Sequence, residues 1–167
     1  MPEYFDVVDK NDNVVGRALR SECHKNPKLI HRGVFVIIIN RKGEVMIQKR
    51  GMKADTNPGR WEFMGEHNKI GESYKSAAIR GLREELGIKK ANVRKISKMK
   101  ISSRRETEFD EIFTCKISEK SRIKINSKEV SEAKFLSTNQ LENLMRKKPR
   151  PFSSWSIRVF NECRKLL

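Results

Sequence analysis

The stretch GESYKSAAIRGLREELGI, residues 71–88, decides the fold of this chain. Its apolar residues recur at spacings of three and four positions, which predicts an amphipathic helix. Ser73 can cap the start of this helix, because a serine hydroxyl accepts a hydrogen bond from a free backbone N–H group. Gly87 ends it, since glycine readily adopts the left-handed conformation that follows a helix. The apolar stripe is expected to contain Tyr74, Ala77, Ala78, Leu82 and Leu86.

Two neighbouring glutamates, Glu84 and Glu85, project from the end of this helix. Residues three and four apart share a helix face, so Gly81 lies on the same face as both. Adjacent carboxylates repel unless a positive group lies near them, and a hard divalent cation such as Mg²⁺ takes oxygen ligands and bridges to phosphate. The alternative is a solvated acidic turn that is compensated by Arg80 and Arg83.

The spacing of these residues resembles the Nudix box, G-x5-E-x7-R-E-U-x-E-E-x-G-U, in which U is apolar. A fixed pattern of this length is a specific signal. Membership of the Nudix superfamily implies an α/β fold, a mixed β-sheet sandwiched between α-helices, and a divalent metal that binds a diphosphate linkage. Seven of the nine fixed positions match: Glu72, Arg80, Leu82, Glu84, Glu85, Gly87 and Ile88.

The resemblance also implies roles for individual residues. The metal, Mg²⁺ or Mn²⁺, would be bound by Glu84 and Glu85, which would be catalytic, with Glu72 close to it. An ion pair between Glu72 and Arg80 would stabilise the loop–helix geometry. Structural roles in the box would fall to Arg80, Gly71 and Gly87.

Two positions depart from the pattern: Glu66 stands where the box begins with glycine, and Gly81 stands in place of a glutamate. In the family that glutamate usually binds metal or helps to activate water, and losing a general base typically costs ~10²–10⁴ in rate. Gly81 also costs the helix about 1 kcal/mol relative to alanine, so no gain in stability explains it. One hypothesis is that Glu66 replaces the lost charge from the loop side.

Further segments are similar to the branch of the superfamily that contains isopentenyl-diphosphate isomerase and hydrolase-like relatives. The resemblance covers nearly the whole chain. The segments are 4–50, PGRW at 58–61, GEHNKIGESY at 65–74 and KPRPFSSW at 148–155.

The chain has three histidines, His24, His31 and His67. In the isomerases, three histidines at corresponding places bind a divalent metal together with glutamates. Imidazole suits Zn²⁺ or Mn²⁺ better than Mg²⁺, so Zn²⁺ is possible at this cluster. The alternative is that His31 and His67 are ordinary strand-edge and loop residues.

The isomerases use a cysteine and a glutamate to move protons on a carbon skeleton. The cysteine position falls on Gly65, so we expect no efficient isomerase. Glu111 matches the glutamate, which makes it a candidate metal ligand or catalytic base. The second metal-binding glutamate of that strand falls on Phe109, next to Glu108.

Arg50, Lys49 and Arg60 are candidate phosphate contacts, although exposed basic side chains are more often solvated. The formal net charge of +16 favours attraction to an anion such as a diphosphate, a nucleotide or nucleic acid. A solvated lysine-rich surface explains most of these charges, and no sequence motif supports dedicated nucleic-acid binding. Nucleic acid is therefore a possible partner but not the favoured one.

The 167 residues predict one domain spanning 1–167. Three cysteines without a C-x-x-C pair favour a reducing compartment. The sequence has neither a signal-peptide pattern nor a run of roughly 18 apolar residues, so we expect a cytoplasmic protein without a membrane span. Turn formers predict hairpins at 3–19 and 33–50 and a tight loop at 57–61. We further expect strands at 92–102, 108–117 and 129–137, and helices at 137–148 and 151–167.

The leading interpretation is a metal-dependent Nudix hydrolase that cleaves a diphosphate linkage in a small molecule such as a nucleoside diphosphate derivative. One alternative is an isopentenyl-diphosphate isomerase-like enzyme, which the missing thiol at Gly65 disfavours. Another is a catalytically weakened module that binds a nucleotide or an RNA end, for which Gly81 is the best support. The sequence leaves the oligomeric state open.

Overall fold

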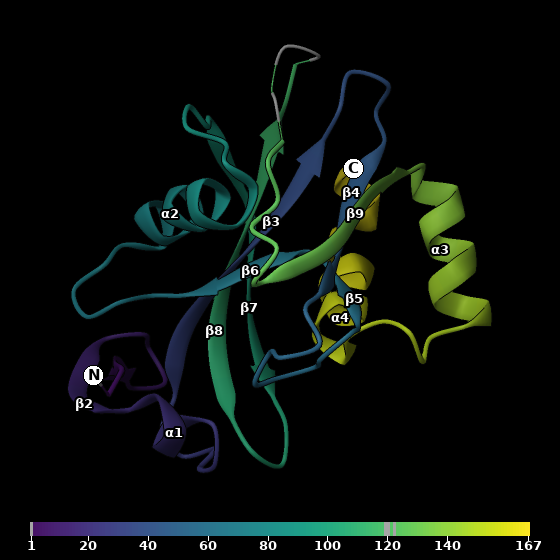
Figure 1. The fold of residues 1–167 in the computed structure, drawn as a ribbon. Helices are drawn as coiled ribbons and strands as arrows, with labels where there is room; N and C mark the ends of the chain where they lie inside the picture. Colours follow the sequence, from purple (N-terminus) through teal and green to yellow (C-terminus); the bar gives the residue numbers. More distant parts are fainter. Residues whose placement is uncertain (1, 119–120, 122) are drawn as a thin grey trace.

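The structure is a computed structural model that describes residues 2–118, 121 and 123–167. It contains a mixed seven-stranded sheet and a separate two-stranded sheet, with helices packed around the larger one (Figure 1). The strands are β1 (Tyr4–Val8), β2 (Val14–Leu19), β3 (His31–Ile39), β4 (Val45–Arg50), β5 (Trp61–Glu62), β6 (Met64–His67), β7 (Val93–Ser102), β8 (Thr107–Lys116) and β9 (Val130–Leu136).

The described residues also form four α-helices and one short 3-10 helix. None of the described helices combines the length and the apolar character that crossing a membrane requires. The helices are α1 (Arg20–Cys23), α2 (Tyr74–Leu86), α3 (Thr138–Lys147) and α4 (Ser154–Cys163), and the 3-10 helix is η1 (Arg164–Leu166).

The large sheet is mixed because β3 and β8 run parallel while its other strand pairs are antiparallel. Its strand order is β5-β4-β3-β8-β7, and β6 and β9 pair with β3 and β4 respectively. In the parallel pair, His31 lies opposite Glu108 and Ile39 lies opposite Lys116. Strand β3 therefore runs through the middle of the sheet, as expected for an apolar segment that is buried on both faces.

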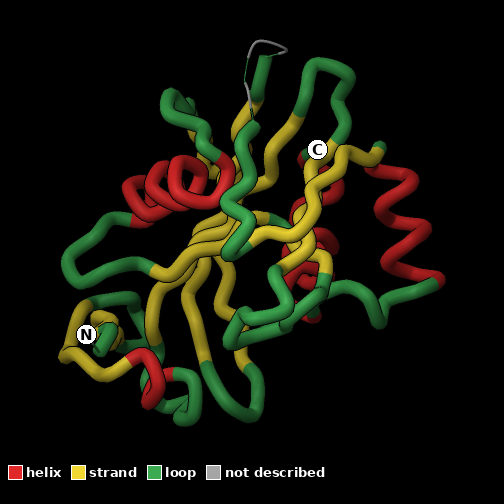
Figure 2. Tube along the Cα trace, in the orientation of Figure 1, coloured by secondary structure: helices red, strands yellow, loops and turns green. Residues whose placement is uncertain are grey.

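Helices cover both faces of this sheet (Figure 2). Side chains of a strand alternate between faces. Accordingly, Val36 of β3 packs in the cluster that contains Leu82 of α2, whereas Ile37 packs with Phe160 of α4. Helix α3 covers the same face as α4 through Leu141. The predicted fold, a mixed sheet between α-helices, is confirmed.

Helix α2 begins and ends where its sequence predicts. The Ser73 hydroxyl accepts a hydrogen bond from the backbone N–H of Ser76, and Gly87 adopts a left-handed conformation with φ of 67°. The four aliphatic residues of the predicted stripe are buried. The start of α3, which the sequence leaves open between two residues, is capped by Ser137.

The first predicted hairpin is confirmed by the pairing of β1 with β2. The second is only partly right: the turn closes with Gly43 N–H donating to Asn40 O at 3.0 Å, but β3 and β4 share the single pair Ile39–Val45. Beyond that pair the strands diverge, because β6 takes the edge of β3 and β9 takes the edge of β4. The elements β5, β6 and α1 have no counterpart in the sequence prediction.

Candidate active site

Glu85 is buried at the inner face of α2, where only 5% of the residue is exposed. Gln48 of β4 donates its side-chain N–H to Glu85 Oε2 at 2.5 Å, and Gln48 Oε1 has no hydrogen-bond partner among the described residues. Burial raises the pKa of Glu85 to about 8, and repulsion from Glu66, Glu62 and Glu129 adds to the effect. A cation bound beside this carboxyl group would lower its pKa and favour its charged form.

A polar cavity opens beside Glu85. Its acidic lining includes Glu66 and Glu129, and the segment after β4 contributes several polar and charged groups. Four basic side chains also line it: Arg20, Arg50, Lys53 and Lys128. This mixture of carboxylates and cations is suited to a metal-bound anion such as a diphosphate.

Arg80 ties the surrounding carboxylates together. Its Nε and Nη2 donate to the two oxygens of Glu72, each at 2.9 Å, which is the ion pair predicted from the box. Nη2 also donates to the carbonyl of His67 at 2.8 Å, while Nη1 lies 2.9 Å from Glu66 Oε2 and 3.4 Å from Glu84 Oε2. One guanidinium thus joins α2, the loop before it and β6.

Glu84 and Glu85 diverge, contrary to the prediction that they project together. Successive helix residues point about 100° apart, and the side chain of Glu84 is 41% exposed and paired with Arg80 and Arg83. Glu84 and Glu72 line neither this Glu85 cavity nor a second, adjacent cavity, called the histidine cavity here, whose lining includes His24, His67 and Glu108. Among the residues proposed from the box to bind metal, the structure brings Glu85 alone into the cavity.

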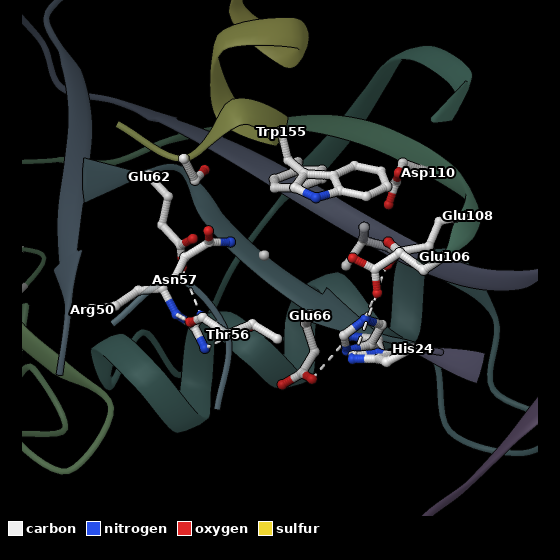
Figure 3. Close-up of a pocket in the computed structure, with 15 residues that line it drawn as sticks. His24, Arg50, Thr56, Asn57, Glu62, Glu66, Glu106, Glu108, Asp110 and Trp155 are labelled. Atoms are coloured by element: carbon white, nitrogen blue, oxygen red, sulfur yellow. Dashed lines mark hydrogen bonds and ion pairs between the residues drawn. The ribbon is translucent and has the colours of Figure 1, made fainter. Parts of the chain in front are cut away.

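The three histidines meet in space. His24 follows α1, His31 begins β3 and His67 ends β6, and each offers a ring nitrogen within 4.8 Å of the others and of Glu108 on β8. Glu108 Oε1 lies 3.2 Å from His31 Nε2 and 3.4 Å from His67 Nε2. Glu106 lies 3.6 Å from His24 Nδ1 and stands beside the cluster (Figure 3).

Burial and neighbouring charges shift the pKa values of the residues in this cluster. Burial lowers the pKa of His24 to about 3, with further contributions from His67, Arg20 and His31, so the ring is neutral at ordinary pH. Burial alone would raise the pKa of Glu108, but His67 and His31 hold it below its usual range. Burial alone would lower the pKa of His67, but Glu108 raises it above its ordinary value, so a metal that binds here displaces a proton from that ring.

The donor set fits a metal on chemical grounds. His24 Nε2 is buried and has no hydrogen-bond partner within the described residues, so its lone pair is free to act as a ligand. Three imidazoles and one carboxylate suit Zn²⁺ or Mn²⁺. The carboxylates beside Glu85 instead suit a hard cation such as Mg²⁺ or Mn²⁺.

Glu108, not Glu111, joins the histidines. Side chains alternate along β8, and Ile112 packs on the α4 face while Phe113 packs on the α2 face. Glu111 accordingly points to the α2 side of the sheet, where its Oε1 lies 2.6 Å from Lys95 Nζ. The prediction that Glu111 belongs to the histidine cluster is corrected by this alternation.

Asp110 is a residue of this region that sequence reasoning missed. It is fully buried, lines the histidine cavity, and neither side-chain oxygen has a hydrogen-bond partner in the described part of the chain. Burial raises its pKa, and Glu108 raises it further. Gly33 makes room for it, since a Cβ at that position would stand 2.5 Å from Asp110 Oδ1. Side chains two residues apart on a strand share a face, so Asp110 lies on the same face of β8 as Glu108. This alternation could have identified Asp110 from the sequence.

The aromatic ring of Phe35 packs tightly against position 65. A Cβ at Gly65 would lie 3.0 Å from Cε1 of the Phe35 ring. Few real Cβ contacts are this close, so a larger side chain at position 65 would require the ring to move. Phe35 therefore packs directly against the position at which the resemblance to the isomerases places a cysteine.

The basic candidates separate into one that faces the cavities and two that do not. Arg50 lines both cavities and is held by Glu62 Oε1 at 2.7 Å and by the Thr56 carbonyl at 2.8 Å. Arg60 instead donates to the carbonyl of Phe152 at 3.2 Å and to that of Arg150. The ammonium group of Lys49 lies 6.0 Å from the centre of the Trp61 ring. Within the described chain, Arg60 and Lys49 line neither cavity.

Comparison with known proteins agrees with this arrangement. The model of the NUDIX domain family matches residues 29–156. The chain belongs to the Nudix family. The matched range includes α2, Glu85, His31, His67 and Glu108 but begins after His24.

Two relatives of this Nudix chain have names that describe different enzymes, an isomerase and a hydrolase. A Photorhabdus laumondii protein named isopentenyl-diphosphate Delta-isomerase 2 is 29% identical over 166 residues, covering 96% of this chain and 92% of its own length. An uncharacterized Nudix hydrolase of Pseudomonas aeruginosa is 31% identical over 135 residues, covering 80% and 78%. The isomerase-like branch predicted from the sequence is confirmed.

Solved structures share the Nudix fold. A Deinococcus radiodurans protein matches with a TM-score of 0.79 at 21% identity, covering 96% of this chain and 99% of its own. The Nudix domain of Shewanella oneidensis NrtR, solved in complex with ADP ribose, matches with a TM-score of 0.63 at 15% identity, covering 80% and 86%.

Proposed function

We propose that this Nudix protein is a metal-dependent hydrolase that cleaves a diphosphate linkage in a nucleoside diphosphate derivative or a similar small molecule. The observation that carries the proposal is the buried carboxyl of Glu85, which faces a cavity lined by further carboxylates and by four basic side chains. A charged carboxylate that is buried without a neighbouring cation is energetically unfavourable. A divalent cation relieves that cost and at the same time gives a diphosphate something to bind.

The chain's own residues supply binding and orientation. Gln48 fixes the Glu85 carboxyl through a hydrogen bond of 2.5 Å. Arg50 is held in place by Glu62 and Thr56, so its guanidinium is preorganised to bind phosphate oxygens, while Lys53 and Lys128 add positive charge at the cavity wall. When bound beside Glu85, Mg²⁺ or Mn²⁺ would neutralise the diphosphate and lower the pKa of an attacking water.

The charges of the cavity support this substrate class. Four cations beside an acidic metal site match a diphosphate that carries several negative charges, and the cavity offers no comparable apolar surface. A Nudix domain of the same fold binds ADP ribose, in which a diphosphate joins two ribose units. ADP ribose therefore belongs in the substrate screen beside simpler nucleoside diphosphate derivatives.

An isopentenyl-diphosphate isomerase activity is the second candidate. Two observations favour it: the cluster of His24, His31, His67 and Glu108, and the 29% identity to a protein that bears the isomerase name over nearly the full chain. Against it, no thiol stands at Gly65, and a side chain at that position would press on the ring of Phe35.

One experiment separates the candidates. The purified protein is incubated with nucleoside diphosphate derivatives, ADP ribose and isopentenyl diphosphate in the presence of Mg²⁺, Mn²⁺ or Zn²⁺. Phosphorus NMR detects cleavage and proton NMR detects isomerisation. We expect cleavage of at least one nucleoside compound, with a loss of ~10²–10⁴ in rate for Glu85→Gln.

The matched control is Glu132→Gln, because Glu132 is exposed on β9 and forms no ion pair with the described residues. It should retain the wild-type rate. Isomerisation without cleavage would favour the second candidate. Nucleotide binding without turnover under every metal would contradict both enzymatic candidates and favour a binding module.

A further inference from the structure

Gly81 lies directly beneath strand β6. It is one helical turn before Glu85 on the buried face of α2. A Cβ at this position would stand 2.9 Å from Met64 Sδ and 3.2 Å from Glu66 Cβ. The space that a side chain at position 81 would need is therefore already filled by two residues of β6, and one of these residues is acidic.

The Glu66 carboxylate is held at the junction of the two cavities. Its Oε1 accepts the backbone N–H of His67 at 3.0 Å, and its Oε2 lies 2.9 Å from Arg80 Nη1. Glu66 lines both the Glu85 cavity and the histidine cavity. Figure 3 shows it between Thr56 and Arg50 on one side and His24 on the other.

We propose that Glu66 is a metal ligand of the Glu85 site and supplies, from β6, the carboxylate that the box pattern places at position 81 on α2. The inference rests on the proposed function and adds a ligand to it. The exchange is reciprocal: the box pattern has glycine at 66 and glutamate at 81, and this chain has the reverse. The number of carboxylates in the site is conserved, although one of them comes from another element.

The exchange also explains why α2 keeps a glycine. Glycine in a helix interior costs about 1 kcal/mol relative to alanine, and even alanine would bring a Cβ too close to Met64 and Glu66. The carboxylate on β6 and the glycine on α2 therefore form one packing unit, in which the absence of a side chain on the helix admits the side chain from the strand.

A purely structural role for Glu66, as a counter-ion of Arg80, is the competing explanation. Arg80 already has the bidentate carboxylate of Glu72 and the carbonyl of His67 as partners, together with Glu84 at 3.4 Å. If neutralising Arg80 were the only need, Glu66 would be redundant. The competing explanation also predicts that removing the charge of Glu72 would be at least as harmful as removing that of Glu66.

Binding of Mn²⁺ tests the proposal without a substrate. Isothermal titration calorimetry measures affinity, and electron paramagnetic resonance of Mn²⁺ counts the bound ions. Wild type is compared with Glu66→Gln, with Glu85→Gln and with the variant that carries both changes. We expect Glu66→Gln to weaken by at least ~10-fold the same site that Glu85→Gln weakens. The two effects should be strongly non-additive in the double variant, since both residues serve one ion.

A swapped variant keeps the test informative if a single change affects folding. Glu66→Gly combined with Gly81→Glu restores the box pattern and removes the Glu66 Cβ from the path of the new side chain. We expect it to recover Mn²⁺ affinity to within about threefold of wild type. Gly81→Glu alone should instead lower the free energy of unfolding, because position 81 is already filled. Urea denaturation with chelator measures that loss independently of metal.

Two control variants complete the design, and each outcome decides a question. Glu132→Gln should leave Mn²⁺ binding unchanged, and Glu72→Gln should weaken it less than Glu66→Gln does. Equal weakening by Glu72→Gln, or wild-type affinity in Glu66→Gln while Glu85→Gln loses an ion, would overturn the role of Glu66 and leave the proposed function standing. Unchanged binding in Glu85→Gln would refute the metal site itself, and the inference with it.

Discussion

Replacing Glu85 with glutamine should stabilise the metal-free protein at neutral pH. Burial raises the pKa of Glu85 from 4.5 to about 8. Between these two values the native state keeps a proton that the unfolded chain loses, so the free energy of unfolding falls as pH rises through this window. At pH 7 the penalty in wild type amounts to about 3 kcal/mol. Glutamine has the same shape and no charge, and therefore avoids this penalty.

Urea denaturation with a chelator present, at half-unit steps from pH 4.5 to pH 8, measures the effect. The quantity of interest is the difference in free energy of unfolding between Glu85→Gln and wild type. Other titrating groups, including His24, whose lowered pKa has the opposite influence, cancel in this difference. The difference should be near zero at pH 4.5 and reach about 3 kcal/mol in favour of the variant at pH 7.

With saturating Mn²⁺, wild type should be more stable than Glu85→Gln. A ligand that binds only the native state raises the free energy of unfolding, and wild type binds this ion through Glu85. Glu132→Gln is the matched control and should show no pH-dependent difference from wild type. A difference that stays flat from pH 4.5 to pH 8, or a variant less stable than wild type throughout, would refute the claim that Glu85 is a strained buried acid.

Three further outcomes follow from packing. Gly65→Cys should lose ~1–3 kcal/mol of stability against the Phe35 ring and should produce no isomer of isopentenyl diphosphate by proton NMR; efficient turnover would contradict the assignment of that space. Gly33→Ala should be destabilised by a similar amount, because its methyl group meets Asp110, and should weaken Zn²⁺ uptake in calorimetry; wild-type values in both measurements would argue against the tight contact. Arg60→Ala should lower stability by ~1–2 kcal/mol through two lost hydrogen bonds to carbonyls with no change in substrate KM, and a raised KM would return Arg60 to the phosphate site.

Local patterns predicted the elements that are local in origin. Helix α2 depends on its apolar spacing, on Ser73 and on Gly87, all of which lie within one segment, and its bounds agree with the sequence to within two residues. Strands β5 and β6 contain two and four residues, too few to show a period. They exist because β4 and β3 offer edges to pair with, and such pairing is invisible along the chain.

The sequence predicts which residue types belong to the site, but it does not predict the directions in which their side chains point. The resemblance to the isomerases points to His24, His31 and His67, the Nudix box points to Glu85, and the structure places the three histidines together. Glu111 was misplaced because a shift in alignment by an odd number of residues moves a side chain to the other face of a strand. The directions of basic side chains such as Arg60 depend on packing partners that are remote in sequence.

The contact between Phe35 and position 65 constrains how this chain can evolve. Substitutions arise one at a time, and a cysteine at position 65 would press against the ring of Phe35 as long as that ring is present. A smaller residue at 35 would have to become established first, and on its own it would leave a void next to the core. The effects of the two substitutions on stability should therefore be non-additive, because the two side chains are in direct contact. The packing of Phe35 against position 65 therefore sets the order in which the two substitutions are tolerated.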